Sequence, residues 1–296
     1  GDSKGNGWAI DTLINGIDLS PVYSLLLNPE ILKVFHAPRQ DLEIIYKLMG
    51  KIPRPIFDTQ SAGMACGFGD SVSYEVLVKN LLEIKIDKSS RYSDWSKRPL
   101  HLKQLEYAIA DVTYLSKVYL FLNRQITKNK RSVWIKEEVE KFYDTDLYKV
   151  DPYSVWEKIK IKHSNPRTSC ILREIAALRE QLAIKNNLQK NMILKDDILV
   201  KISLNPPRNI NDLKKIRGLP YSKLSNKIKN LIILAVNKGK SSDINKGILK
   251  KTHIKSRAQK SLIDMLNILL KNTAETHNIS AKLIGNKKDM EKLASG

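Results

Sequence analysis

The sequence has few cysteines and no long apolar run. Among its 296 residues are only two cysteines, Cys66 and Cys170, too few for a disulfide scaffold or a cysteine-based zinc site. No run of about 18 apolar residues occurs, so we predict no membrane-spanning helix. No signal peptide is recognisable in the first residues. These absences disfavour secreted and membrane proteins, and we predict a cytoplasmic protein without a membrane partner.

Acidic residues are scarce in the second half of the chain. Residues 1–150 hold 21 Lys and Arg against 19 Asp and Glu, a net charge of +2, whereas residues 151–296 hold 30 against 12, a net charge of +18. A concentrated positive charge is typical of proteins that bind polyanions, because each neutralised phosphate releases counterions. Biased codon usage would enrich lysine in both halves. We therefore favour a nucleic-acid partner, which is RNA or, as the alternative, DNA.

The stretch from Leu105 to Leu122 has the pattern of an amphipathic helix. Its apolar residues recur every three or four positions, at Leu105, Ala108, Ile109, Val112, Leu115, Tyr119 and Leu122. Tyr107 and Asp111 are four residues apart, so the phenol and the carboxylate lie on one helical face, one turn apart. An exposed pair without function has the same spacing. The residues that precede the pair favour a function.

Residues 86–115 carry many fixed positions of one enzyme family. They are Asp87-Lys88-Ser89, Ser93-Asp94-Trp95, Arg98-Pro99-Leu100, Gln104, Tyr107-Ala108, Ala110-Asp111 and Tyr114-Leu115. This segment resembles the ribonuclease D family, whose Tyr-x3-Asp helix is the third motif of a ribonuclease H-like α/β exonuclease fold. The resemblance implies a 3′-5′ exoribonuclease that hydrolyses RNA with two divalent metal ions, Mg²⁺ or Mn²⁺.

A second motif of that family corresponds to residues 34–50. Asp41 lies in the first turn of a predicted helix that ends at Gly50. An acidic residue there also interacts favourably with the helix dipole. The resemblance implies that Asp41 and Asp111 bind metal and that Tyr107 orients the attacking water. His36 either contacts substrate or is a satisfied core histidine.

The loop before the catalytic helix carries cationic and aromatic residues. Arg91, Trp95 and Arg98 can hold phosphates or stack on a base, and we predict them as substrate-binding residues. The alternative is that Trp95 and Arg98, with Asp94, fix the loop against the helix. Asp58 is predicted to cap the helix that follows it rather than to act in catalysis.

The first acidic motif of the family is absent. Family members carry an Asp-x-Glu on their first strand, where alternation points both carboxylates to one face. Within residues 1–125 the only Asp-x-Glu is Asp41-Leu42-Glu43, and in a helix these side chains diverge by about 200°. We therefore expect the chain to start after the leading strands. A non-catalytic RNA- or DNA-binding remnant is the alternative function, and a DNA exonuclease is a third, weaker possibility.

The N-terminal region before the second motif is predicted to mix short elements. A turn-forming cluster precedes a strand-like segment at 8–11, and a strand is expected at 31–35. A helix is predicted over 19–27, with Ser20 as its N-cap and Pro21 at its first position.

The chain divides into four predicted regions. Residues 1–125 form the α/β exonuclease domain without its first strands, and 126–165 form a helical connector. Residues 166–240 resemble the all-α HRDC module that accompanies ribonuclease D, with helices expected at 171–182, from Asp196, at 209–218 and at 219–238. Residues 241–296 resemble a second, incomplete HRDC module, so we expect truncation at this end too. The predicted function is processing of the 3′ ends of transfer RNA precursors by a monomer.

Overall fold

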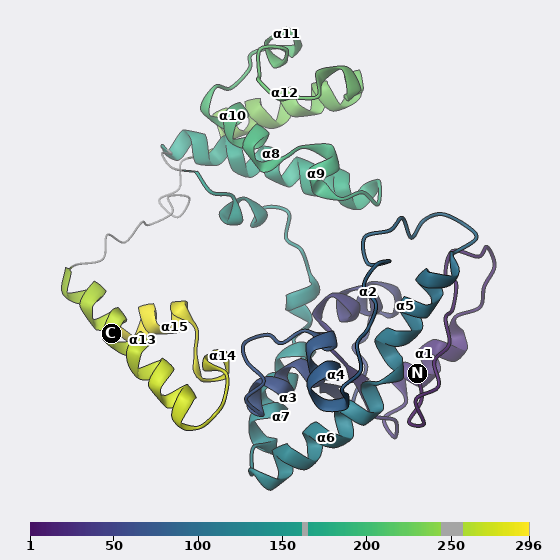
Figure 1. Cartoon of the computed structure of the whole chain (residues 1–296). Coiled ribbons are helices and arrows are strands. Elements are labelled where there is room, and N and C mark those ends of the chain that lie inside the picture. Colours follow the sequence, from purple (N-terminus) through teal and green to yellow (C-terminus); the bar gives the residue numbers. More distant parts are fainter. Residues whose placement is uncertain (162–164, 244–256, 296) are drawn as a thin grey trace. The chain divides into compact units, whose positions relative to one another are not determined.

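The chain forms two compact units. The computed structural model describes residues 1–161, 165–243 and 257–295. Unit 1 comprises Gly1–Tyr148 and Lys255–Gly296, and unit 2 comprises Lys149–Ile254. Unit 2 is therefore an insertion in the sequence of unit 1. Figure 1 shows both units coloured along the chain.

Unit 1 is mostly helical. Before the insertion it contains α1 (Ser20–Leu27), β1 (Lys33–Phe35), α2 (Arg39–Met49), β2 (Ile56–Asp58), α3 (Thr59–Ala65), α4 (Tyr74–Leu82), α5 (Leu102–Thr113), α6 (Leu115–Lys128), α7 (Ser132–Glu140) and 3-10 turns at Lys141–Tyr143 and Thr145–Tyr148. After the insertion it contains α13 (Arg257–Thr276), α14 (Ala281–Ile284) and α15 (Lys287–Leu293). Helix α6 contacts β1, and helix α7 contacts β2.

The two strands pair in parallel. Lys33 pairs with Ile56 and Phe35 pairs with Asp58. All three residues of β2 are buried, as is usual for a parallel sheet covered on both faces. Leu42, Leu77 and Leu122, from α2, α4 and α6, are fully buried in the same apolar cluster. This cluster fixes the helices around the strands.

The helix predicted over 105–122 is interrupted at Tyr114. A continuous helix would bond the Tyr114 N–H to the Ala110 carbonyl. Instead the Tyr114 N–H donates to the Tyr74 hydroxyl at 3.3 Å, and that hydroxyl donates to the Ala110 carbonyl at 3.2 Å. The Tyr74 side chain thus enters the helical hydrogen-bond ladder and separates α5 from α6, a recognised cause of helix breaks. The prediction of one helix was wrong because it did not include this distant residue.

Two predictions for the N-terminal region were also wrong. Residues 8–11 form no strand, and Trp8 and Ile10 stay exposed. Strand geometry requires a paired neighbour, and no strand pairs with this segment within the described residues. The N-cap of α1 is Leu19 rather than Ser20, because the Ser20 hydroxyl donates to Asp18 at 2.8 Å instead. The predicted end of α2 at Gly50 was confirmed, with φ 66°.

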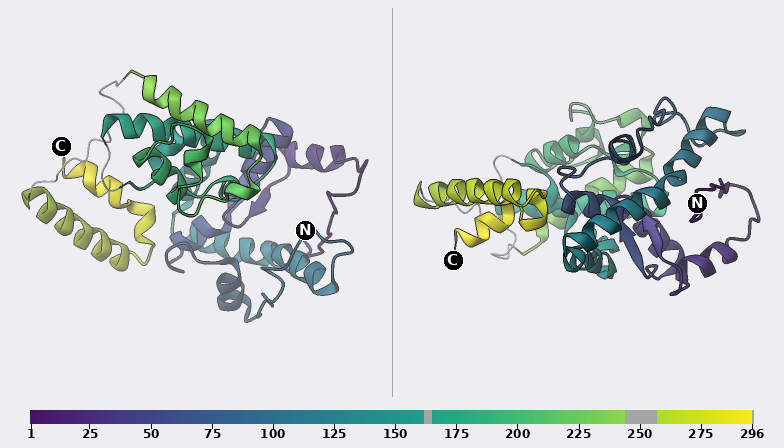
Figure 2. Two further views of the ribbon diagram at one scale, coloured as in Figure 1. Left: turned by 90° about the horizontal axis from the view of Figure 1, so that it is seen from above. Right: turned by 60° about the horizontal axis from the view of Figure 1, so that its bottom comes forward.

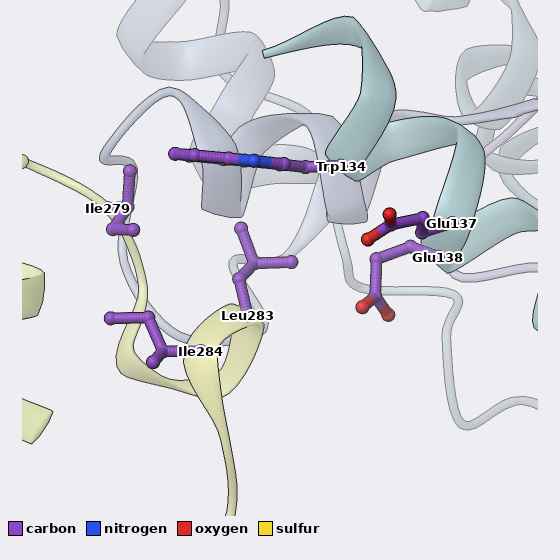
Figure 3. A pocket seen from close by; sticks show the side chains of 6 residues that line it. All are labelled: Trp134, Glu137, Glu138, Ile279, Leu283 and Ile284. Atoms are coloured by element: carbon purple, nitrogen blue, oxygen red, sulfur yellow. The ribbon is translucent and has the colours of Figure 1, made fainter.

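The segment after the insertion packs on α3 and α7. The Arg131 guanidinium donates to the Ala65 carbonyl at 2.5 Å and to the His277 carbonyl at 2.7 Å. The Ser280 N–H donates to the Met64 carbonyl at 2.9 Å. A pocket of about 240 Å³ lies between α7 and α14, lined by Trp134, Glu137, Glu138, Ile279, Leu283 and Ile284 (Figure 3). None of the predicted site residues lines it.

Unit 2 is a helical module built on one long helix. It contains a 3-10 turn at Val155–Lys158, α8 (Pro166–Lys185), α9 (Lys190–Ile193), α10 (Asp196–Leu204), α11 (Ile210–Leu213), a 3-10 turn at Tyr221–Lys223 and α12 (Asn226–Ser241). Helices α8 and α12 lie side by side, as Figures 1 and 2 show. A Cβ on Gly239 would come within 2.5 Å of the Ile171 Cα, so this close approach requires glycine.

Most of the helices predicted for unit 2 were confirmed, with longer or shorter bounds. The helix expected at 209–218 is only the four-residue α11, which ends at Leu213 and is followed by turns up to Gly218, whose φ is 90°. The helix expected from 219 begins at Asn226, after a 3-10 turn. Residues 162–164 of the predicted connector and residues 244–256 and 296 of the predicted second module lie outside the described residues. None of the described helices has the length and apolar character needed to cross a membrane.

Candidate active site

The face of α5 carries the predicted catalytic pair. A capping box begins the helix: the Lys103 N–H donates to His101 Nδ1 at 3.3 Å, and the His101 N–H donates to Gln104 Oε1 at 2.9 Å. From this fixed start, Tyr107 and Asp111 follow at three and seven residues beyond Gln104, on the same helical face. Tyr107 is half-buried, and Asp111 is exposed as a whole residue although its carboxyl group is partly buried.

Asp41 lies at the start of α2, just after the turn that joins β1 to this helix. Ala37 adopts φ 53° in this turn, and its N–H donates to the Asp58 carboxylate at 2.8 Å. Asp58 is buried and also accepts from the N–H groups of Gln60 and Ser61, so it caps α3 as predicted. Helix α2 starts at Arg39, which places Asp41 in its first turn, as predicted.

The electrostatics show that Asp41 and Asp111 share one neighbourhood. Partial burial, with the charges of Glu75 and, to a smaller extent, Asp41, raises the pKa of Asp111 to about 6 against the opposing effect of Arg91. Partial burial also raises the pKa of Asp41. Both carboxylates are therefore harder to ionise than in water. Partial burial of the carboxyl group acts on both, and repulsion by neighbouring negative charges acts on Asp111. A cation bound to the Asp111 carboxylate would offset this repulsion.

His36 lies beside the site as a partly buried, hydrogen-bonded ring. Its Nδ1 is 2.9 Å from the Thr59 hydroxyl, and its ring centroid is 5.7 Å from that of Tyr74. Burial lowers the pKa of His36, so the neutral ring is favoured at neutral pH. This environment is that of a hydrogen-bonded histidine, since a backbone hydrogen bond to Val72 acts on the ring as well. His36 remains a predicted substrate-binding residue.

The loop between α4 and α5 brings Trp95 and Arg91 toward Tyr107. The ring centroids of Trp95 and Tyr107 are 6.1 Å apart, within the range of aromatic pairs. Partial burial raises the pKa of Tyr107, as it does that of Asp111, and the charge of Arg91 opposes both increases. The structure therefore brings these two predicted substrate-binding residues close to the face of α5 that carries Tyr107 and Asp111.

Arg98 is engaged in holding the loop. Its guanidinium donates to both oxygens of Asp11 at 2.6 Å and to the carbonyls of Trp95 and Lys97 at 2.9 and 2.8 Å. A bidentate pair of this kind has fixed geometry. These contacts match the alternative interpretation, in which Arg98 locks the loop. Its role in substrate binding remains a prediction.

Sequence reasoning missed Tyr74 and Glu75 at the start of α4. Glu75 forms an ion pair with Lys88 at 3.1 Å, and its charge raises the pKa of Asp111 and of Tyr107. From the sequence alone, Glu75 is recognisable only as an acidic residue in the first turn of a helix. No spacing rule connects it to Asp111, because the two residues lie on different helices.

The donor set fits one divalent cation. Within the described part of the chain, no group of three or more His, Cys, Asp and Glu side chains is placed to hold a metal ion. Mg²⁺ is commonly held by one or two carboxylates, with water and substrate phosphate completing its coordination. Asp41 and Asp111, both destabilised in their charged forms, suit such a site. A second ion would need further carboxylates of the kind that an Asp-x-Glu strand supplies.

Comparisons with known proteins agree with both units. Residues 2–127 match the family described as 3′-5′ exonuclease, and residues 170–234 match the HRDC domain. A ribonuclease D of Bartonella henselae is 42% identical over 288 residues, covering 97% of this chain and 71% of the relative. A ribonuclease D of Jannaschia sp. is 40% identical over 290 residues, covering 97% of this chain and 75% of the relative.

A solved structure shows the same architecture. The crystal structure of Escherichia coli RNase D, described as an exoribonuclease involved in structured RNA processing, matches with a TM-score of 0.78 and 25% identity, covering 94% of this chain and 74% of that one. These comparisons confirm the resemblance to ribonuclease D. They also confirm the predicted fold class, an exonuclease domain followed by an HRDC domain. The chain belongs to the ribonuclease D family of 3′-5′ exoribonucleases.

Proposed function

We propose that this chain removes nucleotides from the 3′ ends of RNA by metal-dependent hydrolysis, and that its substrates are transfer RNA precursors and other structured RNAs. The observation that carries this proposal is that the charge of Asp41, in the first turn of α2, acts on Asp111, which shares a face of α5 with Tyr107. The E. coli relative is involved in structured RNA processing, which supports the choice of substrate. We propose further that the protein acts as a monomer in the cytoplasm.

Each residue of the site has a separate task in this proposal. Asp41 and Asp111 hold Mg²⁺ or Mn²⁺, which when bound supplies an activated water and stabilises the leaving oxygen. The Tyr107 hydroxyl hydrogen-bonds the attacking water and orients it toward the phosphorus. Arg91 neutralises charge on the phosphate, and Trp95 stacks on a base near the 3′ end. His36 contacts the terminal nucleotide.

A non-catalytic alternative has its own supporting observation. The described residues include no Asp-x-Glu strand beside Asp41 and Asp111, and two-metal hydrolysis draws on more carboxylates than these two. Unit 2 carries 23 Lys and Arg against 8 Asp and Glu, a charge sufficient for RNA binding by itself. In this second proposal the chain binds RNA or DNA without hydrolysing it.

The experiment that separates them measures release of nucleotides from a labelled single-stranded RNA in Mg²⁺ or Mn²⁺, for the wild-type chain and for Asp111→Asn. We expect the variant to lose at least about a hundredfold in rate, the scale for removing one well-placed charge-stabilising group. Glu106→Gln, on an exposed position of the same helix, is the matched control and should retain full rate.

Two further outcomes decide between the proposals. If neither the wild-type chain nor the variant degrades RNA while both bind it with steep salt dependence, the chain is a binding protein only. If a DNA strand of the same sequence is degraded as fast as the RNA, the 2′-hydroxyl plays no part in recognition and the ribonuclease assignment of the site is wrong.

A further inference from the structure

We propose that Gln104 is a positioning residue, which fixes the loop 87–98 on the catalytic face of α5 so that Arg91 and Trp95 are held where the 3′ end of RNA binds. This inference rests on the proposed function. It concerns a residue that contacts no reacting atom and acts through the loop.

The amide of Gln104 makes hydrogen bonds in two directions. Its Oε1 accepts from the His101 N–H at 2.9 Å, within α5. Its Nε2 donates to the Ser93 hydroxyl at 2.9 Å and to the Asp94 carbonyl at 3.3 Å, within the loop. The side chain is buried, with 7% of its surface exposed. A buried amide with its bonds satisfied holds its partners more firmly than an exposed one, because losing a partner leaves a desolvated group unpaired.

The capping role alone does not need an amide. Glutamate performs it equally well, since only the acceptor oxygen is used at the start of the helix. The donor nitrogen is what reaches the loop, and a carboxylate would place negative charge against the Asp94 carbonyl instead. The choice of glutamine at this position is therefore explained by the loop and not by the helix.

The loop has fixed points on both sides of this contact. Lys88 pairs with Glu75 of α4 at 3.1 Å, and Arg98 pairs with Asp11 at 2.6 Å. Both pairs are partly exposed, and such pairs contribute little by themselves. Gln104 supplies the buried contact between them, next to Trp95. The Ser93 hydroxyl, which accepts from Gln104, donates in turn to the Ser90 carbonyl at 2.7 Å, so the contact extends toward Arg91.

The position of Gln104 on α5 links the loop to the chemistry. Residues 104, 107 and 111 share one helical face at spacings of three and four. The element that carries Tyr107 and Asp111 therefore also carries the side chain that fixes Trp95 and Arg91. The loop moves with the catalytic helix, and the RNA contacts keep a constant geometry to the site.

The test uses Gln104→Glu in the full chain, because this variant keeps the helix cap and loses the donation to the loop. Trypsin cleavage after Arg91 and Lys97 reports on the loop without any need for catalysis. We expect initial cleavage about tenfold faster than in the wild type, the scale of one buried hydrogen bond. Gln125→Glu on α6 adds the same charge elsewhere and should change nothing, and Ser93→Ala, which removes one of the two acceptors, should give an intermediate rate.

Kinetics on the single-stranded RNA then separate positioning from a general structural role. Gln104→Glu should raise KM about tenfold and leave kcat within about threefold. Unchanged cleavage after Arg91 and Lys97 would overturn the proposal, as would a loss confined to kcat, since α5 itself would then be disturbed. If the wild-type chain binds RNA without degrading it, the proposed function fails, while the cleavage rates and a tenfold weaker Kd for RNA still decide the role of Gln104.

Discussion

Unit 1 and unit 2 differ in what their charges do. Unit 1 holds 28 Lys and Arg against 23 Asp and Glu, while unit 2 holds 23 against 8 over far fewer residues. In unit 1 the informative charges are carboxylates that the protein makes difficult to ionise, Asp41 and Asp111. In unit 2 the positive charges lie around an apolar helical core. The first arrangement suits the cation site that we propose, and the second suits the proposed binding of a polyanion.

The largest expected effect is a loss of stability of unit 2 after a substitution in its apolar core. Leu199 of α10 is fully buried, and Leu204 at the end of the same helix is 47% exposed. Leu199→Ala should lower the free energy of unfolding of unit 2 by about 2–5 kcal/mol, because it leaves a cavity. Leu204→Ala should cost less than about 0.5 kcal/mol. Urea denaturation followed by circular dichroism measures both, and equal effects would contradict the assigned core.

Metal affinity should depend on pH in unit 1. Asp111, with its pKa raised to about 6, is mostly protonated at pH 5 and mostly ionised at pH 7, and protons compete with metal for the carboxylate. We expect the affinity for Mg²⁺ to fall about tenfold from pH 7 to pH 5, as measured by calorimetry. Asp111→Asn should bind weakly at both pH values. An affinity independent of pH in the wild-type chain would exclude Asp111 as a ligand.

The raised pKa of Asp111 also predicts that the stability of unit 1 falls as pH rises, whereas its metal affinity rises. A carboxyl whose folded pKa lies above its unfolded value stabilises the fold at low pH, and this contribution is lost as pH rises from about 4 through about 6. At pH 7 Asp111→Asn should therefore stabilise unit 1, by about 1 kcal/mol once screening of this exposed group is allowed for. Thermal unfolding of the two proteins at pH 4 and pH 7 measures it. A variant that is less stable at pH 7 would contradict the assigned repulsion.

The smallest expected effects concern single lysines of unit 2. Lys227→Gln, in the first turn of α12, should reduce the slope of log Kd for RNA against log salt by about 0.7 if the lysine contacts a phosphate. Lys47→Gln in unit 1 serves as the control, because Lys47 pairs with Glu43 at 2.6 Å. Equal slopes for both variants and the wild type would show that this part of α12 does not contact RNA.

The sequence predicted the parts of the site that depend on local spacing. Tyr107 and Asp111 on one helical face, Asp41 in a first turn and the Asp58 cap each follow from residues fewer than ten positions apart, and helical geometry fixes such spacings. The family resemblance then supplied the meaning of the pattern. These features needed no knowledge of tertiary contacts.

The rest depended on contacts between residues far apart in the chain. The break at Tyr114 is caused by Tyr74, forty residues earlier, and the pairing of Arg98 with Asp11 spans 87 positions. The effect of Glu75 on Asp111 likewise crosses from one helix to another. Periodicity and propensity describe one helix or strand at a time. They cannot predict that a hydroxyl or carboxylate from another helix will contact it.

The insertion of unit 2 into unit 1 has a consequence for biosynthesis. The Arg131 guanidinium reaches the His277 carbonyl across 146 positions, and the Ser280 N–H bonds the carbonyl of Met64. Since a ribosome makes the chain from its N-terminus, α3 and α7 are synthesised long before the segment that covers them. The surface of α3 and α7 that this segment covers therefore stays exposed to solvent until the whole of unit 2 has been translated.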